Sequence, residues 1–291
     1  MRFALVDACR IDHPVRALCA LLDVSPSGFY AWLGREPSAR AVEDAELREA
    51  IGEVHAGSRG TYGSPRVHAE LVAGGWTVGV NRVARLMREG GIRVRPARAF
   101  CRTTRSDAAH VPAPNELQRD FSAEGPNEKW GGDVTYVPTG EGWLYLATMI
   151  DLYNREVVGW AMGEHNDQML TGRALAMALE AQSPPPGLIA HSDRGSTYTA
   201  GDYRDSLRDA GIVCSMSRRG DCWDNAVAES FFATIKKELV SRVRYATRSE
   251  AASSIFEWIE VFYNRVRRHS VLGYLTPVEY RQNTTATATS A

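Results

Sequence analysis

Residues 131–162 read GGDVTYVPTGEGWLYLATMIDLYNREVVGWAM, and this stretch decides the fold of the chain. Three runs in it are rich in β-branched and aromatic residues, which favour strands. These runs are 131–137, 143–151 and 156–162. Gly140 and Gly142 indicate a turn between the first two runs, and Asn154 indicates another before the third. The stretch therefore predicts three consecutive strands that form a meander.

After this stretch, helical and strand patterns alternate. They predict, in order, a helix at 168–181, a strand at 188–193, a helix at 200–210, a strand at 212–216 and a long helix from Asp224. A meander followed by alternating helices and strands predicts an α/β fold, in which helices flank a mixed sheet. This is the element order expected of a ribonuclease-H-like domain.

The first hundred residues predict an all-α region. Short helices are expected at 15–24 and 25–33, with Ser25 or Ser27 at the start of the second, and further helices are expected within 42–94. Glycines end these helices and the last one is rich in arginine, which suits a DNA-binding helix-turn-helix module. Small helical bundles without a DNA role share this pattern, so it leaves both interpretations open.

We divide the chain into six parts. They are an N-terminal helical segment at 1–40, a helix-turn-helix-like domain at 41–105, a proline-containing linker at 106–127, a ribonuclease-H-like core at 128–240, a C-terminal helical region at 241–282 and a tail at 283–291. The tail is of low complexity, and we expect it to be disordered.

The composition is that of a globular protein. Hydrophobic residues make up 44% of the 291 residues, and no apolar run approaches the roughly 20 residues of a membrane helix. The first residues, MRFALVDACRIDH, carry charges too early for a signal peptide, so we expect a cytoplasmic protein. The five cysteines show no zinc-binding spacing and are interpreted as reduced thiols.

Positive charge is concentrated in one segment of a chain whose net charge is −1. Between residues 79 and 105 the only acid is Glu89, and the bases are Arg82, Arg85, Arg88, Arg93, Arg95, Arg98, Arg102 and Arg105. This segment is either a solvated arginine-rich face or a surface that binds DNA phosphates. The candidate DNA contacts are Arg82, Arg85, Arg88, Arg93 and Arg95.

Three acids stand where the predicted elements would meet. Asp133 lies in the first strand, Asp193 follows a short apolar strand, and Glu229 lies in the long helix. Converging carboxylates raise each other's pKa unless cations neutralise them. Two divalent ions, Mg²⁺ or Mn²⁺, bind such oxygens and assist the attacking and leaving oxygens of a phosphodiester. We therefore predict that these three acids are the catalytic residues and the metal ligands.

Helix periodicity supports the third acid. At about 100° per residue, Asn225, Glu229 and Lys236 fall within one arc, whereas Phe231 and Ile235 lie on the other side. One face of this helix therefore packs and the other faces the predicted site. Lys236 lies roughly 10 Å beyond Glu229 along the axis, which suits a DNA phosphate contact, although it also fits an ordinary surface lysine. We add Lys236, Asn225 and Arg194 to the candidate DNA contacts.

Several segments in the same order resemble one enzyme family. In the core they are WGGDVTYV (130–137), IDLYNREVVGW (150–160), HSDRGSTY (191–198) and DNAVAESFFATIKKEL (224–239). They resemble the motifs of DDE transposases and retroviral-type integrases, and the 35 residues between Asp193 and Glu229 match the D,D-35-E pattern of that superfamily. The segment YNRVRRHSVLGYLTPVEY (263–280) and the N-terminal helical segments resemble those of insertion-sequence transposases made from a second reading frame.

The resemblance implies an enzyme that cleaves insertion-sequence ends and transfers the strands. It places the catalytic triad on Asp133, Asp193 and Glu229, and it implies that Lys236 is the basic residue seven positions after the glutamate. It also implies an oligomer, at least a dimer, on terminal-repeat and target DNA, and a helix-turn-helix or zipper partner from an upstream frame. Two alternatives stay open, namely a DNA-binding regulatory product with little activity until fused to that partner, and a structure-specific nuclease.

Other polar residues near these motifs receive structural interpretations. We expect Asp151 to hydrogen-bond in a turn near Asn154, and we expect His191 to be packed or hydrogen-bonded rather than catalytic. The sequence does not decide the role of a basic cluster near the C-terminus, which consists of Arg265, Arg267, Arg268 and His269.

Overall fold

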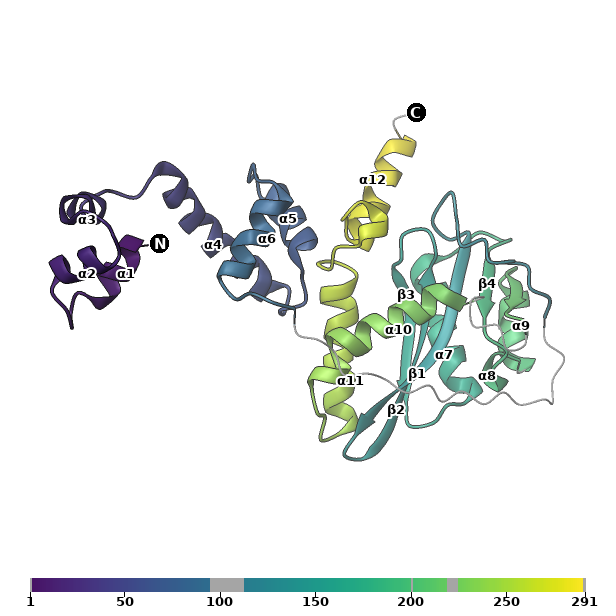
Figure 1. Cartoon of the computed structure of the whole chain (residues 1–291). Coiled ribbons are helices and arrows are strands. Elements are labelled where there is room, and N and C mark those ends of the chain that lie inside the picture. Colours follow the sequence, from purple (N-terminus) through teal and green to yellow (C-terminus); the bar gives the residue numbers. More distant parts are fainter. Residues whose placement is uncertain (1, 95–112, 200, 219–224, 290–291) are drawn as a thin grey trace.

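The computed structural model describes residues 2–94, 113–199, 201–218 and 225–289. Within these ranges the chain forms a five-stranded sheet with helices on both faces, a helical domain beside it and a small three-helix unit at one end (Figure 1). The expected α/β fold, preceded by an all-α region, is confirmed.

The sheet contains the predicted meander and two added strands. The strands are β1 (Lys129–Thr139), β2 (Gly142–Asp151), β3 (Val157–Gly163), β4 (Ile189–Ser192) and β5 (Val213–Met216). β1, β2 and β3 pair antiparallel, while β4 pairs parallel with β1, and β5 pairs parallel with β4. The resulting order, β3-β2-β1-β4-β5, is a mixed sheet in which β1, which contains Asp133, is the neighbour of β4, which Asp193 follows.

One face of the sheet is covered by α7 (Gln168–Gln182) and α9 (Gly201–Asp209). α9 corresponds to the helix expected at 200–210, and the short helix α8 (Ser196–Thr199), which precedes it, was not expected from the sequence. Gly159 of β3 permits the close packing of α7, because a Cβ at this position would lie 2.3 Å from the carbonyl oxygen of Ala174.

The other face is covered by α10 (Ala226–Glu238) and α11 (Arg248–Glu257). A short 3-10 helix, η2 (Val240–Arg242), joins them, and the π-helical segment η3 (Trp258–Tyr263) continues α11 and buries its aromatic side chains in the same core.

The helical domain consists of α4 (Ala39–Gly57), α5 (Ser64–Ala73) and α6 (Val80–Glu89). Its buried side chains, including Ile51 and Leu86, belong to the same apolar cluster as those of α10, α11 and one face of the sheet. The helical domain and the sheet domain therefore share a core.

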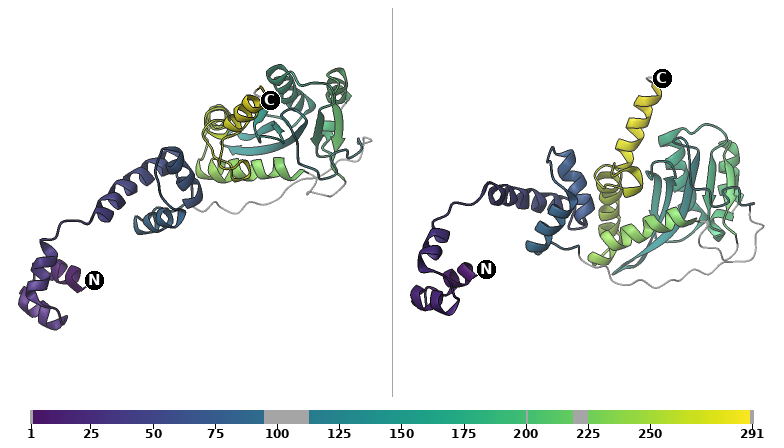
Figure 2. Two further views of the ribbon diagram at one scale, coloured as in Figure 1. Left: turned by 90° about the horizontal axis from the view of Figure 1, so that it is seen from above. Right: turned by 45° about the horizontal axis from the view of Figure 1, so that its top comes forward.

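The three N-terminal helices form a separate small unit. They are α1 (Arg2–Cys9), α2 (Val15–Leu21) and α3 (Pro26–Leu33). Their core consists of Val6, Cys19 and Phe29, and the Ser25 side chain caps α3 by accepting the Gly28 N–H, as expected for one of the two proposed helix starts. Figures 1 and 2 show this unit at the far end of the molecule, connected through the chain that leads into α4.

Part of the expected linker packs against the edge of the sheet. The carbonyl oxygen of Pro114 accepts the Met216 N–H at 3.2 Å, and the Ser215 hydroxyl oxygen accepts the N–H groups of Glu116 and Leu117. Ala113 and Leu117 are buried. The segment from Ala113 onward is therefore fixed to β5, and the preceding linker residues, 106–112, lie outside the described residues.

The C-terminal segment passes through η4 (Ser270–Leu272) and ends in α12 (Pro277–Thr289). The expectation of a disordered tail from residue 283 is corrected here, because α12 continues to Thr289. Thr284 stabilises this extension: its hydroxyl donates to the carbonyl oxygen of Tyr280 and accepts a hydrogen bond from the Tyr153 hydroxyl, each at 2.9 Å. None of the helices in the described ranges is long and apolar enough to cross a membrane.

Candidate active site

Asp133 lies in β1, at the centre of the sheet, and its side chain is half-buried. Its Oδ1 accepts the N–H of Val134 at 2.8 Å. Burial raises the pKa of Asp133 well above its usual value, the charges of Asp193 and Glu229 raise it further, and the Val134 N–H and Lys236 lower it. Both other predicted acids are therefore close enough to act on Asp133.

Asp193 follows β4 directly and stands at the end of the strand that pairs parallel with β1. Its Oδ1 accepts the Gly195 N–H at 2.9 Å. A Cβ on Gly195 would lie 2.9 Å from that same oxygen, so glycine allows the chain to turn closely around the carboxylate. Burial raises the pKa of Asp193, and the Gly195 N–H partly offsets that effect.

Glu229 lies in the first turn of α10 and is exposed. The predicted division of this helix into two faces is confirmed, because Phe231 and Ile235 are buried while Lys236 is half-buried on the side of Asp133. The Lys236 ammonium lies 5.2 Å from the centre of the Tyr136 ring. Burial lowers the pKa of Lys236, and the negative charge of Asp133 raises it.

Asn225 connects the start of α10 to the site. Its side-chain amide donates to the carbonyl oxygen of Gly132 at 3.3 Å, next to Asp133, and the side chain is buried. Asn225 therefore fixes the helix that carries Glu229 to the strand that carries Asp133. A DNA contact by Asn225 stays a prediction, and such a contact would have to compete with this bond.

The chemistry of the donor set suits a divalent cation. Three carboxylates from β1, the end of β4 and α10 provide only hard oxygen ligands, which Mg²⁺ prefers. Burial and the two neighbouring acids both raise the pKa of Asp133, and a bound cation would offset these effects. In the described part of the chain, no three His, Cys, Asp or Glu side chains are close enough together to hold a metal ion as they stand. The three acids would have to come closer together to bind one metal centre.

Family comparisons match both halves of this architecture. A family described as HTH-like domain matches residues 42–100, and families described as integrase core domain match residues 123–222 and 210–277. A 31 kDa protein of insertion element IS600 from Shigella sonnei is 48% identical over 91% of this chain and 97% of its own length. Transposase InsF for insertion sequence IS3A from Escherichia coli (strain K12) is 36% identical over 98% of this chain and all of its own length.

The chain belongs to the insertion-sequence transposases of the IS3 type. It is a DNA transposase, and the expected family is confirmed. Among solved structures, the transposase is similar to the HTLV-2 integrase catalytic core domain in complex with magnesium, with a TM-score of 0.43 and 16% identity over 55% of this chain and 99% of that one. It is also similar to a chain of the simian T-cell lymphotropic virus intasome, with a TM-score of 0.46 and 11% identity over 79% of this chain and 74% of that one.

Two residues near the transposase site have the structural roles expected of them. His191 is buried, and its ring nitrogens bond the hydroxyls of Ser215 at 2.8 Å and Ser217 at 3.1 Å. Asp151 accepts the N–H groups of Asn127 and Tyr153, at 2.7 and 2.8 Å. His191 therefore ties β4 to β5 and the residue after it, and Asp151 fixes the chain before β1 and the turn after β2. Arg194, a candidate DNA contact, donates from Nε to the carbonyl oxygen of Ser217.

The described arginines in α6 and just after its end divide into two groups. Arg82 and Arg85 each donate to a carboxylate oxygen of Asp44 at 2.8 Å, and these two bonds, led by the one from Arg85, lower the pKa of Asp44 to about 2. Arg88 and Arg93 are exposed and line a groove of about 280 Å³ between the start of α5 and the end of α6. Arg95 lies outside the described residues.

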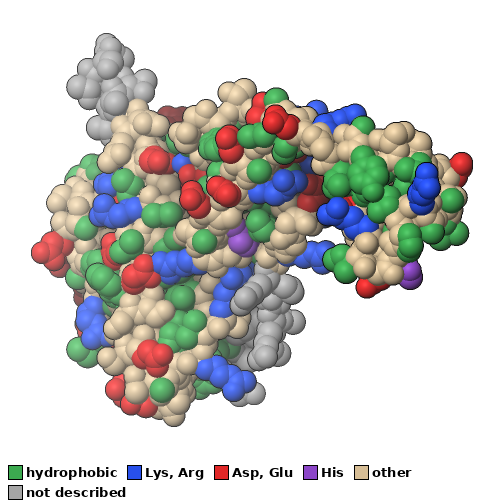
Figure 3. Space-filling model, turned by 90° about the vertical axis from the view of Figure 1, so that its left-hand side faces the viewer, with side chains coloured by type: hydrophobic (Ala, Val, Ile, Leu, Met, Phe, Trp, Pro, Cys, Tyr) green, Lys and Arg blue, Asp and Glu red, His purple; other side chains and the backbone are tan. Residues whose placement is uncertain are grey.

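The distribution of charge over the visible surface agrees with this pairing. Lys and Arg side chains are interspersed with Asp and Glu side chains on the face drawn in Figure 3, rather than forming one continuous basic surface. Within the described part of the basic segment, Arg82 and Arg85 are therefore neutralised by acids from α4 and α6, and the exposed Arg88 and Arg93 are the positions to consider for DNA.

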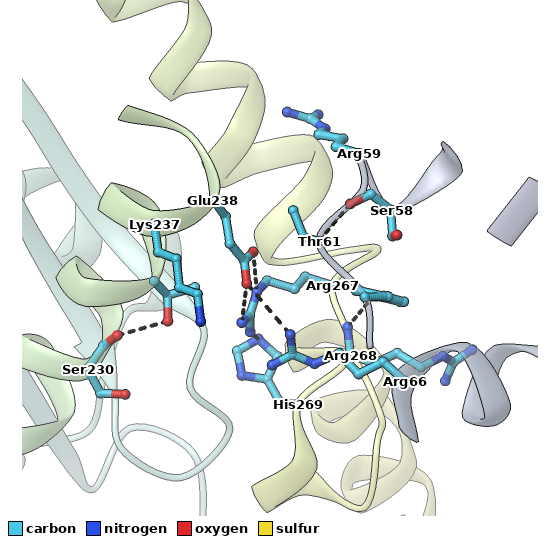
Figure 4. A network of polar contacts seen from close by, with 12 residues as sticks. Ser58, Arg59, Thr61, Arg66, Ser230, Lys237, Glu238, Arg267, Arg268 and His269 are labelled. Atoms are coloured by element: carbon cyan, nitrogen blue, oxygen red, sulfur yellow. Dashed lines mark hydrogen bonds and ion pairs between the residues drawn. The ribbon is translucent and has the colours of Figure 1, made fainter. Parts of the chain in front are cut away.

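The C-terminal basic cluster is mostly engaged in ion pairs (Figure 4). Arg267 is buried and donates two hydrogen bonds to the carboxylate of Glu238, at the end of α10, each at 2.8 Å. Arg66 of α5 approaches Glu238 at 3.6 Å. Arg268 pairs with Glu70 of α5 at 2.8 Å. These contacts join the helical domain, the end of α10 and the C-terminal segment, and we name them the Glu238 network.

His269 completes the Glu238 network. Its Nε2 accepts from Arg267 at 3.3 Å, and its ring stands edge-on to Tyr263. Burial lowers the pKa of His269 to about 2, with further lowering by Arg267, Arg66 and Arg155, so the ring is neutral. Sequence reasoning did not find the partner acid. A signal was present, since Glu238 lies three residues after Ile235 on the apolar face of its helix.

Proposed function

We propose that this transposase cuts the ends of its insertion element and joins them to target DNA, with Asp133, Asp193 and Glu229 as the ligands of two divalent cations, Mg²⁺ or Mn²⁺. The observation that carries the proposal is the half-buried carboxyl of Asp133, whose pKa is raised by burial and by the charges of two acids from separate elements. A cluster of this kind is costly without cations and is the ligand set that phosphoryl transfer uses.

The bound cations would stabilise the attacking and leaving oxygens of the scissile phosphodiester. The protein supplies the geometry: Asp133 and Asp193 come from neighbouring parallel strands, and Glu229 comes from a helix that Asn225 fixes to β1. Lys236, on the same face of α10, binds a phosphate of the DNA that lies across the three acids.

Two displacements follow from this arrangement. In the first, a water oxygen attacks phosphorus at the element end, the bond from phosphorus to the 3′ oxygen breaks, and the 3′ oxygen leaves as a hydroxyl with a proton. In the second, that hydroxyl loses its proton and attacks a phosphorus of the target strand, whose own 3′ oxygen leaves. Neither step forms a bond between protein and DNA.

The helical domain supplies binding rather than chemistry. Its exposed Arg88 and Arg93 contact phosphates of the terminal repeats, and Arg95 adds to them. We propose at least a dimer on DNA, assisted by a helix-turn-helix or zipper partner from an upstream frame, because two element ends must be held together. Since the substrate is chromosomal DNA, the protein works in the bacterial cytoplasm at the nucleoid.

The test is strand transfer with labelled element ends in Mg²⁺ or Mn²⁺, with and without the upstream-frame product. Asp193→Asn should lose about 10²-fold or more of the activity, because losing a metal ligand removes several kcal/mol of stabilisation. The matched control is Asp209→Asn, which changes an exposed acid at the end of α9 and should retain full activity. Strand transfer at the wild-type level in all three variants, Asp133→Asn, Asp193→Asn and Glu229→Gln, would refute the proposal. Activity of the wild type only in the presence of the partner product would identify a chain that works as a fusion.

A further inference from the structure

Thr148 lies directly beside Asp133. The two residues are partners in the antiparallel register of β1 and β2. Side chains that are directly opposite in such a pair point to the same face, with Cβ atoms about 4.5–5.5 Å apart. Thr148 and Asp133 therefore lie side by side on the face of the sheet that α10 covers, the face that also carries Leu146 and Ile150.

The hydroxyl of Thr148 is buried and unsatisfied. The residue is fully buried, and its Oγ1 has no hydrogen-bond partner within the described residues. Leaving a buried hydroxyl without a partner costs about 1–3 kcal/mol. Valine has the same shape and would fill the position without that cost, so packing alone does not account for a hydroxyl here.

The acceptor that the register offers is the carboxylate of Asp133, the residue directly opposite Thr148. Metal ligands of this kind bind in the ionised form, and a carboxylate has about four lone-pair positions. One oxygen of Asp133 already accepts the Val134 N–H, and cations would take only part of the remaining capacity. Donors from a neighbouring side chain commonly orient a ligating carboxylate in this way.

We propose that Thr148 is a positioning residue for Asp133, and that its hydroxyl donates a hydrogen bond to the Asp133 carboxylate when the site holds metal. The inference rests on the proposed function, because it needs Asp133 to be a ligand. Until that bond forms, the hydroxyl has no partner among the described residues and lowers stability. In the loaded protein it holds the carboxylate in its binding orientation.

The proposal predicts opposite effects on stability and on metal binding. Thr148→Val removes the unsatisfied hydroxyl, so the metal-free full-length protein should melt at the same or a higher temperature than wild type. Its half-saturating Mn²⁺ concentration, measured from the rise in melting temperature during a titration, should increase by about 10- to 100-fold. Thr148→Ser, which keeps the hydroxyl, should bind Mn²⁺ within about threefold of wild type.

Thr171→Val is the matched control. Thr171 is a buried threonine of α7 whose hydroxyl is near the carbonyl oxygens of Gln168 and Thr197, at 3.2 and 3.3 Å. Removing that hydroxyl should lower the melting temperature and leave Mn²⁺ binding unchanged, the reverse of the Thr148→Val pattern. If Thr148→Val does not fold, the pair Thr148→Ser and Thr148→Ala carries the test, since both lack the methyl group and differ only in the hydroxyl.

The outcomes separate this inference from the proposed function. If Thr148→Val binds Mn²⁺ as tightly as wild type, or if Thr148→Ala binds it as tightly as Thr148→Ser, the proposed role of the hydroxyl is overturned and the proposed metal site is not. No rise in melting temperature with Mn²⁺ in wild type, or the same rise in Asp193→Asn, overturns both. Weaker Mn²⁺ binding in Thr148→Val together with unchanged metal-free stability supports the inference.

Discussion

Arg82 and Arg88 lie six residues apart on α6 and have different surroundings. Arg82 is held by Asp44 and Glu43, whereas Arg88 is exposed beside the groove at the start of α5. A guanidinium that is paired with carboxylates must break those bonds before it binds a phosphate, while an exposed one gives up only water. Residues of the same type on one helix therefore differ in their availability to DNA.

Substitutions on α6 should show this difference. Arg88→Ala and Arg93→Ala should each weaken binding to an element end and reduce the slope of log K against log salt by about 0.9, one phosphate contact each. Fluorescence anisotropy at several salt concentrations measures the slope. Arg82→Ala serves as the comparison: it should leave the slope unchanged and lower the melting temperature, because Asp44 loses a partner. A reduced salt slope in Arg82→Ala, with unchanged slopes in Arg88→Ala and Arg93→Ala, would show instead that Arg82 is the DNA contact.

His269 makes stability depend on pH. Its pKa is about 2 in the folded protein, against about 6.5 in the unfolded chain. Below pH 6.5 the unfolded state therefore binds a proton that the folded state does not, and the free energy of unfolding falls by about 1.4 kcal/mol per pH unit toward pH 2.

Urea unfolding between pH 7 and pH 4 measures this effect. In His269→Gln, which cannot titrate, the free energy of unfolding should fall less steeply as the pH is lowered over this range. The difference in slope should correspond to about one proton taken up on unfolding. The neighbouring charges of Arg267, Arg66 and Arg155 stay constant there, so they do not account for the difference. Identical pH profiles for wild type and His269→Gln would contradict a neutral, buried His269.

At the level of elements, α10 connects the predicted chemistry to the rest of the molecule. Glu229 stands in its first turn and Glu238 at its end, about 13 Å apart along the axis. The first end is fixed to β1 by Asn225, and the second is held by Arg267 and Arg66. The position of Glu229 therefore depends on contacts at both ends of one rigid helix.

Breaking the pair at the far end should destabilise the whole fold. Glu238→Gln leaves Arg267 buried without its countercharge, and we expect a loss of about 3–5 kcal/mol in the free energy of unfolding. Arg265→Ala removes an exposed arginine from the same sequence motif and should change stability by no more than about 0.5 kcal/mol. Urea denaturation of both variants provides the measurement. A similar loss in both would show that the motif acts through its charge and not through the buried pair.

Elements with a regular pattern were predictable from the sequence, and contacts between distant segments were not. Alternation and helix periodicity depend on local geometry, so they located the meander, α7 and the two faces of α10. Asp44, which both Arg82 and Arg85 bind, lies about forty residues away from them, and the acid that pairs with Arg267 lies 29 residues before it. Thr148 became notable only once the register placed it opposite Asp133. No local pattern specifies such pairings.

At the level of the whole molecule, the described residues form three apolar cores. One lies between the sheet and helices α7 and α9, and the other two differ in how many parts of the chain they join. The larger of these two runs from α4–α6 through α10 and α11 to one face of the sheet. The ion pairs of the Glu238 network join the same segments. The smaller one belongs to α1–α3 alone and contains three buried side chains. Folding of the helical domain and of the catalytic fold is therefore linked, while α1–α3 are joined to both mainly through the chain.

This shared core limits how such proteins can recombine. A crossover between α6 and β1 would combine a foreign helical domain with α10, α11 and a C-terminal segment that evolved against different side chains. The ion pairs of Arg66 with Glu238 and of Glu70 with Arg268 would then need new partners of matching charge. A crossover before α4 would separate only the three-helix unit. Hybrid elements with new end specificity are therefore expected to exchange the helical domain and the C-terminal segment together, as one inherited block.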